Sequence, residues 1–572
     1  MTKDHRLKQE RDYLYQDSKQ FTQAYPQLSH FLSEPSFDPD INRTLDGLTY
    51  LTALLNTKLE QAYPQLTASL MNILWPNYLQ QTPSLTILAF NNQHDHTTLI
   101  TAGSTVQSQP ASAGETSCTF SVCRDTWVSP FNITKVTQRD GDELAIHFHA
   151  HHPVNLCPDE LDKLRLYCGS DAHAGSQLYL WFSQYLSQAM LMIDENTFAL
   201  PALRFQPVGF DNEEAMLVYP GNTFNGYRLL HEYFCFPEGF LFFDIQGIPD
   251  YFSQITTRDL TLTLKFSQAL PATVKIAPDL IKSNCVPAIN LFEYDCEPIL
   301  LDGRKTTYPL TIDFQHQDCY ELFAIDQVTG WLNQQSRHYA LFDSFHHQLE
   351  QNKQQHPFYY HLHQQPTLNS DKIQYSIAFV RGDETLINHQ QEVISIRARC
   401  SNNDIAQHLR IGDICRTDDS IPNYIQVRNV TYPSRAIRPN LNASQQWSTI
   451  SSLSLNYLSL LNKTSLCQIL KNYNFTTRYS ARAEKGLEKL LQGIVQFDAV
   501  PAQYTFTDAV IGGYESTLRI SPDAFNSEGE MYLFGAIIAH FYAGYAAVNS
   551  FHFLNLVNAS THEVYQWQLI NH

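Results

Sequence analysis

Apolar residues recur at helical spacing near the start of this chain. In DINRTLDGLTYLTALLNTKLEQ, residues 40–61, the apolar side chains return every three or four positions: Ile41, Leu45, Leu48, Leu51, Leu55 and Leu59. This spacing aligns them in one stripe along an amphipathic helix. A stripe of this kind needs a partner surface. We therefore expect the first 84 residues to form a helical region that packs against other helices, from this chain or from a neighbour.

The pattern changes to that of strands after about residue 85. Several short segments, many of them alternating apolar with polar residues, are bounded by glycine, proline or asparagine, which is typical of strands; they are 84–90, 143–154, 231–248 and 260–266. Helical periodicity returns at 447–462, 481–494 and 529–548. We predict a multidomain α+β fold. Its segments are an N-terminal helical region (1–84), a β-rich module (85–200), an α+β module (201–300), a second β-rich module (301–440) and a C-terminal α+β region (441–572).

One apolar segment raises the question of a membrane helix. LFGAIIAHFYAGYAAV, residues 533–548, is almost wholly apolar, but a spanning helix needs about 20 such residues. His540 also interrupts the segment. We predict a helix buried on all sides in a globular core, and no direct membrane insertion.

Composition and charge narrow the function classes. The chain has 11 cysteines without a CxxC pair, and its first residues, MTKDHRLKQERDYLY, lack the apolar core of a signal peptide. Both features favour reduced thiols in the cytosol. The formal net charge is −19, and most of the excess acid falls in the middle of the chain. Such a surface repels phosphate backbones, so we expect no nucleic-acid partner.

The stretch FNGYRLLHEYFCFPEGFLFF, residues 224–243, contains a candidate for chemistry. Its HEYFC segment places His231 and Cys235 four residues apart, one substitution from the zinc motif HExxH. A metal-dependent hydrolase is therefore one hypothesis; it would use His231, Glu232 and the histidines at 147, 149, 151 and 152. However, the second imidazole and a third ligand are missing from the motif. The same pattern, two histidines separated by one residue, occurs at 94 and 96 and at 361 and 363, which indicates compositional bias. We predict no metal ligand, no catalytic residue and no cofactor.

The same stretch is dense in aromatic residues, which allows two interpretations. Aromatic side chains with arginine are favoured at the centres of protein interfaces, and a well-packed β core would use the same composition. The chain has no GxSxG, GxxxxGK[ST] or GxGxxG motif, so an enzyme finds no support there. A free-standing β-rich adhesin is a further hypothesis, against which the missing export signal argues.

Longer motifs carry a family resemblance. LVYPGNTFNGYRLLHEYFCFPEGFLFF, residues 217–243, resembles the GYRLLQEYF-x-FP hallmark of the TssF family (also called ImpG or VasA), a baseplate subunit of type VI secretion systems. Here His231 replaces the family's usual glutamine, which tells against a need for an imidazole ligand. Further blocks follow in the family's order: RDYLYQDSKQFTQAYPQLSHFL, DPDINRTLDGLTYLTALLNTKLEQAYPQLTASLMNILWPNYLQQTPSL, CVPAINLFEYDCEPILLDGRKTTYPL, SLSLNYLSL and YLFGAIIAHFYAGYAAVNSFHFL.

The resemblance implies a non-enzymatic scaffold, similar to the wedge proteins of contractile phage tails. Two copies of the family protein would join one TssG, with TssE and TssK attached, and six such wedges would surround the VgrG hub. Sheath and tube would grow from this platform, and contraction would follow when wedge contacts rearrange. The baseplate would be cytoplasmic and docked at the inner-membrane complex. The 301–440 module would be a possible wing that touches neighbouring wedges.

This reading places the function in interfaces, and large obligate interfaces bury more than about 2,000 Å². We predict interface residues in the apolar stripe, the aromatic stretch and the CVPAINLF block. They are Leu48, Leu51, Leu55, Leu59, Tyr227, Arg228, Leu229, Leu230, Tyr233, Phe234, Phe236, Pro237, Asn290, Leu291 and Phe292.

Overall fold

The architecture is taken from a computed structural model of the whole chain. It describes residues 70–571 except 73, 111–115, 157–163, 195, 220–223, 249–254, 317, 333–334, 343–357, 367–371, 382–391, 440, 442–445, 448, 451–459, 507–508 and 547–549. The chain divides into two compact units, one of residues 1–74 with 440–450 and the other of 75–439 with 451–572. The predicted N-terminal helix with its leucine stripe lies outside the described residues. The second unit contains every strand and helix described below.

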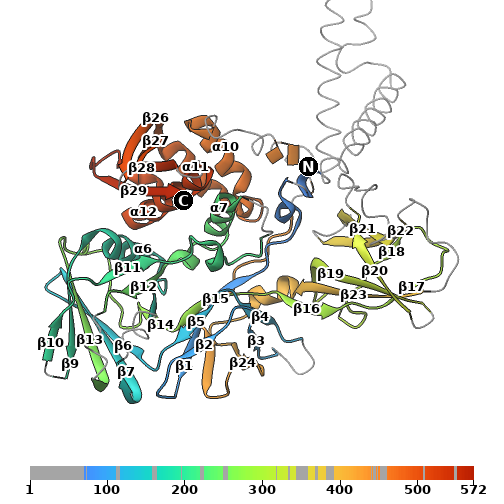
Figure 1. Cartoon of the computed structure of the whole chain (residues 1–572), viewed down its shortest axis with the longest axis horizontal. Coiled ribbons are helices and arrows are strands. Elements are labelled where there is room, and N and C mark those ends of the chain that lie inside the picture. The colour runs from blue at the N-terminus through green and yellow to red at the C-terminus, as the bar shows by residue number, and fades with distance from the viewer. Residues whose placement is uncertain are drawn as a thin grey trace, which may run out of the picture. The chain divides into compact units, whose positions relative to one another are not determined.

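A six-stranded sheet joins segments that are far apart in the sequence (Figure 1). The predicted strand at 84–90 is confirmed as β1, and it pairs antiparallel with β15 on one side and β25 on the other. One core cluster, which includes Leu88, Phe120 and Val286, packs around this sheet. The strands in order are β24 (Ile414–Thr417), β3 (Thr105–Ser108), β4 (Thr119–Val122), β15 (Cys285–Ile289), β1 (Leu85–Asn92) and β25 (Ile425–Asn429).

Two more sheets are built from residues 132–283. The predicted strands at 143–154 and 260–266 are confirmed as β7 and β13, which pair antiparallel. The five-stranded sheet runs β10 (Asn196–Ala199), β9 (Leu186–Ile193), β13 (Thr256–Phe266), β7 (Glu143–Asn155) and β6 (Asn132–Arg139). The four-stranded sheet runs β11 (Arg204–Pro207), β12 (Phe242–Gln246), β8 (Arg165–Tyr167) and β14 (Lys282–Ser283). A short pair, β2 (Thr98–Ile100) with β5 (Thr126–Val128), stands apart.

The predicted β-rich segment 301–440 contributes most of an eight-stranded sheet with its own apolar core, which includes Val328, Phe379 and Ile396. Its order is β16 (Phe292–Asp295), β23 (Glu392–Ser401), β19 (Glu321–Leu332), β20 (Gln335–Leu341), β21 (Phe358–Pro366), β22 (Ile373–Arg381) and β18 (Tyr308–Pro309), and β17 (Ile299–Leu301) pairs with β23. Along β23 buried and exposed residues alternate, because successive side chains of a strand point to opposite faces.

Helices and a further four-stranded sheet follow toward the C-terminus. The predicted helices at 481–494 and 529–548 are confirmed as α11 (Ala481–Gly493) and α12 (Glu528–Tyr545). Most side chains of α12 are buried, as predicted, because the helix packs on α6 (Ala172–Leu180), on α7 and on strands of the last sheet. That sheet runs β26 (Ile494–Phe506), β27 (Ala509–Ile520), β28 (Ser550–Asn558) and β29 (Val564–Asn571). Among the helices that the structure describes, none is long and apolar enough to cross a membrane.

The predicted strand at 231–248 is wrong in its first half. Residues up to Cys235 form the end of helix α7 (Asn225–Cys235), a single 3₁₀ turn follows at Pro237–Phe240, and only β12 is a strand. Pro237 has no N–H to continue the α-helix, so it begins the new turn. The dense aromatic run looks like a strand in sequence because aromatic residues are enriched in strands.

Candidate functional site

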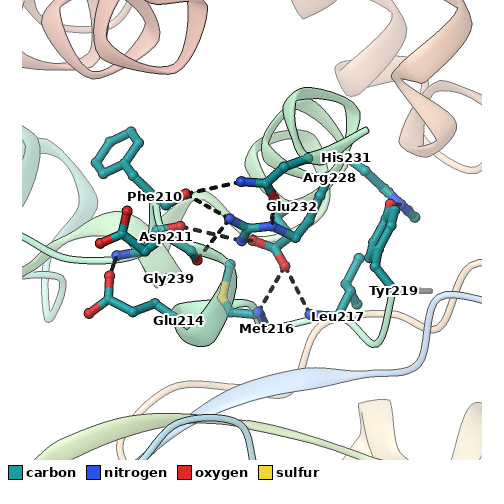
Figure 2. A network of polar contacts seen from close by, with 12 residues as sticks. Phe210, Asp211, Glu214, Met216, Leu217, Tyr219, Arg228, His231, Glu232 and Gly239 are labelled. Atoms are coloured by element: carbon teal, nitrogen blue, oxygen red, sulfur yellow. Dashed lines mark hydrogen bonds and ion pairs between the residues drawn. The ribbon is translucent and has the colours of Figure 1, made fainter. Parts of the chain in front are cut away.

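Helix α7 packs against helices and turns from several parts of the unit. It contacts α12, α10 (Lys463–Tyr473) and two 3₁₀ turns, Pro237–Phe240 and Phe475–Arg478. Its N-cap residue is Phe224, which offers no side-chain cap to the first turn. The family hallmark therefore occupies a structural junction, and its polar residues form a network around the helix (Figure 2).

An ion pair buried in the protein interior is the centre of this network. Arg228 Nη1 lies 2.8 Å from Glu232 Oε2, and the two residues are only 1 % and 0 % exposed. The i,i+4 spacing places both side chains on one face of α7. Removing two charges from water costs several kcal/mol for each ion, and their attraction offsets this only when the remaining donors and acceptors are also bonded.

Those remaining atoms bind the backbone of the loop that precedes α7. Glu232 Oε1 accepts hydrogen bonds from the backbone N–H groups of Met216, at 2.8 Å, and Leu217, at 2.9 Å. Arg228 Nη2 donates to the carbonyl oxygens of Phe210, at 2.8 Å, and Asp211, at 3.0 Å. One ion pair thus satisfies backbone polar groups at both ends of a loop whose middle is exposed, and it fixes residues 210–217 on the helix (Figure 2).

A second buried arginine extends the network toward β12. Arg124 is 1 % exposed, and its guanidinium donates to the carbonyl oxygens of Glu214 and Gly239. Burial lowers the pKa of Arg124 to about 10, so it stays charged at neutral pH. The Glu214 side chain accepts from the Gly209 N–H and from Arg165, which also pairs with Asp244 of β12 at 2.7 Å. Each buried cation in this network has a carboxylate or carbonyl acceptor.

His231 is a structural residue with both ring nitrogens in use. Nε2 lies 2.8 Å from Thr82 Oγ1, and Nδ1 lies 2.6 Å from the Tyr219 hydroxyl. The residue is 4 % exposed, and burial lowers its pKa to about 3, so the imidazole is neutral at physiological pH. Burial also raises the pKa of the Cys235 thiol, which opposes formation of a metal-binding thiolate. The zinc-motif hypothesis for HEYFC therefore has no support from this geometry.

The histidines of β7 do not complete a metal centre either. His147 lies between Thr137 and Thr261, at 3.2 and 3.0 Å, and His149 Nδ1 lies 2.8 Å from Asp259 on the exposed face of the sheet. Within the described part of the chain, neither these histidines nor His231 belongs to a group of three close potential ligands. The arrangement gives the hydrolase hypothesis no reacting group.

Aromatic rings connect α7 to segments from both ends of the unit. Tyr227 stacks on Tyr473 of α10 with 4.5 Å between ring centroids and 9° between planes, and Trp75 stacks on the same Tyr473 at 4.6 Å. Tyr227 also meets Phe541 of α12 edge-on at 5.5 Å. These contacts make α7 a packing centre, and they favour the well-packed-core interpretation of the aromatic stretch over an exposed surface.

The structure places most of the predicted interface residues inside the chain. Buried positions are Tyr227, Arg228, Leu229, Leu230, Tyr233, Phe236, Asn290 and Leu291. Phe234 and Phe292 are half-buried and Pro237 is exposed. Asn290 is held by the Thr119 carbonyl and by Asn402, at 2.7 and 2.8 Å. The four leucines at 48, 51, 55 and 59 lie outside the described residues. Packing within the chain therefore explains the burial of these eight side chains, and no partner protein is needed to explain it.

Comparison with known proteins decides the family. A model of the family described as "Type VI secretion system, TssF" matches residues 5–571. The chain belongs to the TssF family. It is 27 % identical to "Type VI secretion system component TssF1" of Pseudomonas aeruginosa, over 98 % of this chain and 97 % of that protein. The family resemblance read from the sequence motifs is therefore confirmed.

Solved structures resemble this TssF-family chain over nearly its full length. A chain of the TssK-TssF-TssG baseplate subcomplex of the type VI secretion system superposes with a TM-score of 0.76 at 25 % identity, covering 92 % of this chain and 98 % of that one. A chain of the type VI baseplate complex gives a TM-score of 0.60 at 21 % identity over both complete chains. The multidomain α+β fold predicted from the sequence is confirmed by these likenesses.

Sequence reasoning missed what the TssF hallmark does in this chain. Arg228 was proposed for an interface, Glu232 for a metal site, and Thr82, Tyr219 and Arg124 were not singled out. The i,i+4 spacing of Arg228 and Glu232 was the available signal, because opposite charges at that spacing in an aromatic-rich helix indicate a buried ion pair. Thr82, one partner of His231, comes from a distant segment, and neither Thr82 nor Tyr219 carried a sequence signal for this contact.

Proposed function

We propose that this chain is a structural subunit of the type VI baseplate wedge. In the proposal two copies join one TssG, with TssE and TssK attached, around the VgrG hub, and the wedges nucleate sheath and tube and transmit the contraction trigger. The observation that carries it is the family match over residues 5–571 together with the full-length likeness to a chain of a TssK-TssF-TssG subcomplex. The assembly would be cytoplasmic and docked at the inner-membrane complex.

The described site supports a mechanical role for this TssF-family chain. The charged side chains of the hallmark helix form hydrogen bonds with backbone groups of residues 209–217. Its aromatic rings pack against α10 and α12. Such a junction gives a rigid body that can transmit force between surfaces distant from it. No side chain of the network is placed for bond making, so we propose that the protein is not an enzyme.

One exposed apolar row fits the proposed wing. Leu300, Val393 and Trp331 lie side by side on β17, β23 and β19, since Leu300 and Trp331 both pair with Val393. They are 54 %, 44 % and 51 % exposed. Adjacent apolar side chains of this size on a solvent face are typical of contact surfaces. We propose that this row contacts a neighbouring wedge, and that the leucine stripe at residues 48–59 contributes to contacts with TssG.

Co-purification tests the wedge assignment. The chain expressed alone should be poorly soluble, and co-expression with TssG and TssK should give a stable complex with two copies of this chain per TssG, measured by mass photometry. Leu51→Ser with Leu55→Ser should abolish TssG binding. A chain that is monodisperse alone and does not bind TssG would overturn the proposal.

The wing contact needs a separate test in the assembled wedge. Trp331→Ser with Val393→Ser should leave the wedge intact and weaken wedge–wedge association at least tenfold in sedimentation velocity. Val564→Ser is the matched control, because Val564 is 51 % exposed on a different sheet. Equal effects of the two changes would contradict a specific wing surface.

A further inference from the structure

Three residues at one turn gather potential metal ligands on the surface of the molecule. His94, Asp95 and His96 lie between β1 and β2, and their ligand atoms all fall within 4.8 Å of one another. No other group of three His, Cys, Asp or Glu side chains among the described residues is this close. We propose that this turn binds a divalent transition-metal ion of the zinc class, through the two imidazoles and the carboxylate. The inference does not depend on the role in the baseplate.

The backbone of the turn is held in place by a buried side chain. Asn92 is 0 % exposed; its Nδ2 donates to the carbonyl oxygens of His96, at 2.8 Å, and Val128, at 3.2 Å, and its Oδ1 accepts from the His94 N–H at 2.9 Å. The ligand-bearing residues are thus anchored to the β2–β5 pair. An ion binding there would meet a fixed backbone, so the entropy lost on binding is mainly that of three side chains.

One aromatic ring supports both imidazoles. The Tyr424 ring lies 4.1 Å from the His94 ring and 5.9 Å from the His96 ring, between centroids, and its hydroxyl lies 3.2 Å from Thr98 Oγ1. The two histidine rings are 5.4 Å apart. Tyr424 limits the directions in which the imidazoles can turn, and it keeps them on one side of the turn with Asp95.

The donor set matches a borderline cation. Imidazole nitrogen suits Zn²⁺, Cu²⁺ and Ni²⁺, and catalytic zinc sites commonly use three protein ligands and leave one position open. In a tetrahedral zinc site with bonds of about 2.1 Å the ligand atoms are about 3.4 Å apart. His96 Nδ1 and Asp95 Oδ1 are already 3.4 Å apart. The remaining adjustment needs only rotation of exposed side chains, and the open fourth position would hold water or a donor from a docked molecule.

The other histidine pairs of the chain show why spacing alone is insufficient. His361 and His363 lie closer together, with 4.2 Å between ring centroids, yet they belong to no close group of three potential ligands. His149 and His151 are 6.3 Å apart, and His149 already binds Asp259. Both pairs share the alternating sequence pattern of His94 and His96, but neither belongs to a close group of three potential ligands within the described residues. They supply matched controls.

Zinc titration of the full chain, alone or in its complex, tests the site. Zn²⁺ is added at pH 7.5 in competition with a chromophoric chelator. The wild-type chain should show one site with micromolar affinity, and His94→Ala with His96→Ala should weaken it at least tenfold. Asp95→Asn should weaken it less, because the two imidazoles remain. His361→Ala with His363→Ala should leave it unchanged. All five changed residues are exposed or partly exposed, and circular dichroism confirms folding.

Copper spectroscopy supplies a second readout that is independent of affinity. One equivalent of Cu²⁺ should give an electron paramagnetic resonance spectrum with coupling to two imidazole nitrogens, and the His94→Ala, His96→Ala variant should lose it. Three results would overturn the proposal: no wild-type site tighter than about 100 µM, a site that survives the double change, or equal loss in the control pair.

Discussion

Helices α7 and α12 pack against each other, yet they are buried by different physical means. Helix α12 begins at the capping residue Ser527, whose hydroxyl accepts the Glu530 N–H at 3.1 Å, and its body is almost wholly apolar. Helix α7 has no side-chain cap and carries Arg228 and Glu232 into the interior. One helix is stabilised by shape and apolar burial, and the other by a closed polar network.

The difference determines which changes each helix tolerates. The stabilisation from apolar contacts decreases gradually as methylene groups are removed. A buried ion pair is more sensitive, because removing either partner leaves the other charge buried without solvation or a counter-ion. In α12 the vulnerable points are close backbone approaches. In α7 they are the charged atoms that hold residues 210–217.

The largest effect is expected from Glu232→Ala. This change leaves the Arg228 guanidinium without its carboxylate and the N–H groups of Met216 and Leu217 without their acceptor, so the free energy of unfolding should fall by about 3–5 kcal/mol. Urea unfolding of the soluble complex measures it. Glu488→Ala on the exposed face of α11 is the control and should change stability by less than about 0.5 kcal/mol. Glu232→Gln keeps an amide oxygen that can accept from Met216 and Leu217, so its loss should be smaller than that of Glu232→Ala; a larger loss would contradict this account.

A smaller loss is expected from Gly529→Ala in α12. An added Cβ would lie 1.9 Å from the Ser176 carbonyl oxygen, which is backbone and cannot move aside alone. Overpacking of this kind costs about 1–3 kcal/mol. Gly486→Ala in α11 is the matched control: its Cβ meets nothing within 4 Å, and alanine favours the helix by about 1 kcal/mol. The two alanines should therefore shift the thermal midpoint in opposite directions.

The next effect is a pH dependence centred on buried histidines. Burial lowers the pKa of His231 to about 3 and that of His552 to about 4, below the unfolded value of about 6.5. Above pH 6.5 the folded and unfolded chains are both neutral at these sites and stability is complete. As the pH falls from 6.5 toward 4, only the unfolded chain takes up these protons, so stability decreases by about 1.4 kcal/mol per pH unit for each histidine.

His231→Gln separates this contribution from other acid effects. A glutamine amide offers both a donor and an acceptor for Thr82 and Tyr219, so the variant should fold. Its free energy of unfolding should depend less steeply on pH between 6.5 and 5, by the contribution of one histidine. His151→Gln, at an exposed position, should keep the wild-type slope. Identical slopes for the wild type and His231→Gln would show that His231 is not buried as a neutral ring.

The smallest effect concerns the start of α12. Ser527→Ala removes the side-chain acceptor of the Glu530 N–H and should cost about 1 kcal/mol. An equivalent loss from Phe224→Ala at the start of α7 would have another origin, because the Phe224 ring packs against Tyr545, with 3.9 Å between ring centroids, and makes no cap. Ser527→Thr should retain most of the stability, and thermal denaturation ranks the variants.

Several elements were readable from the sequence because their determinants are local. Alternation and flanking turns predicted β1, β7 and β13, and helical periodicity with a long apolar run predicted α12. The prediction failed at residues 231–235, where aromatic residues, which are enriched in strands, occur at the end of a helix. The candidate site was assigned to interfaces or metal because a sequence lists aromatic and charged residues without their neighbours.

The sequence by itself determined the family, the α+β character and the location of long amphipathic or apolar elements, since hydrophobic period and motif order are properties of the chain alone. Only the tertiary structure decided that Glu232 holds a loop, that His231 is a neutral core residue between Thr82 and Tyr219, and that the Tyr424 ring lies against the histidine pair at 94 and 96. These outcomes depend on groups brought together from distant positions. Burial then sets the energetic consequence, because the cost of an unpaired charge or donor depends on how much water remains around it.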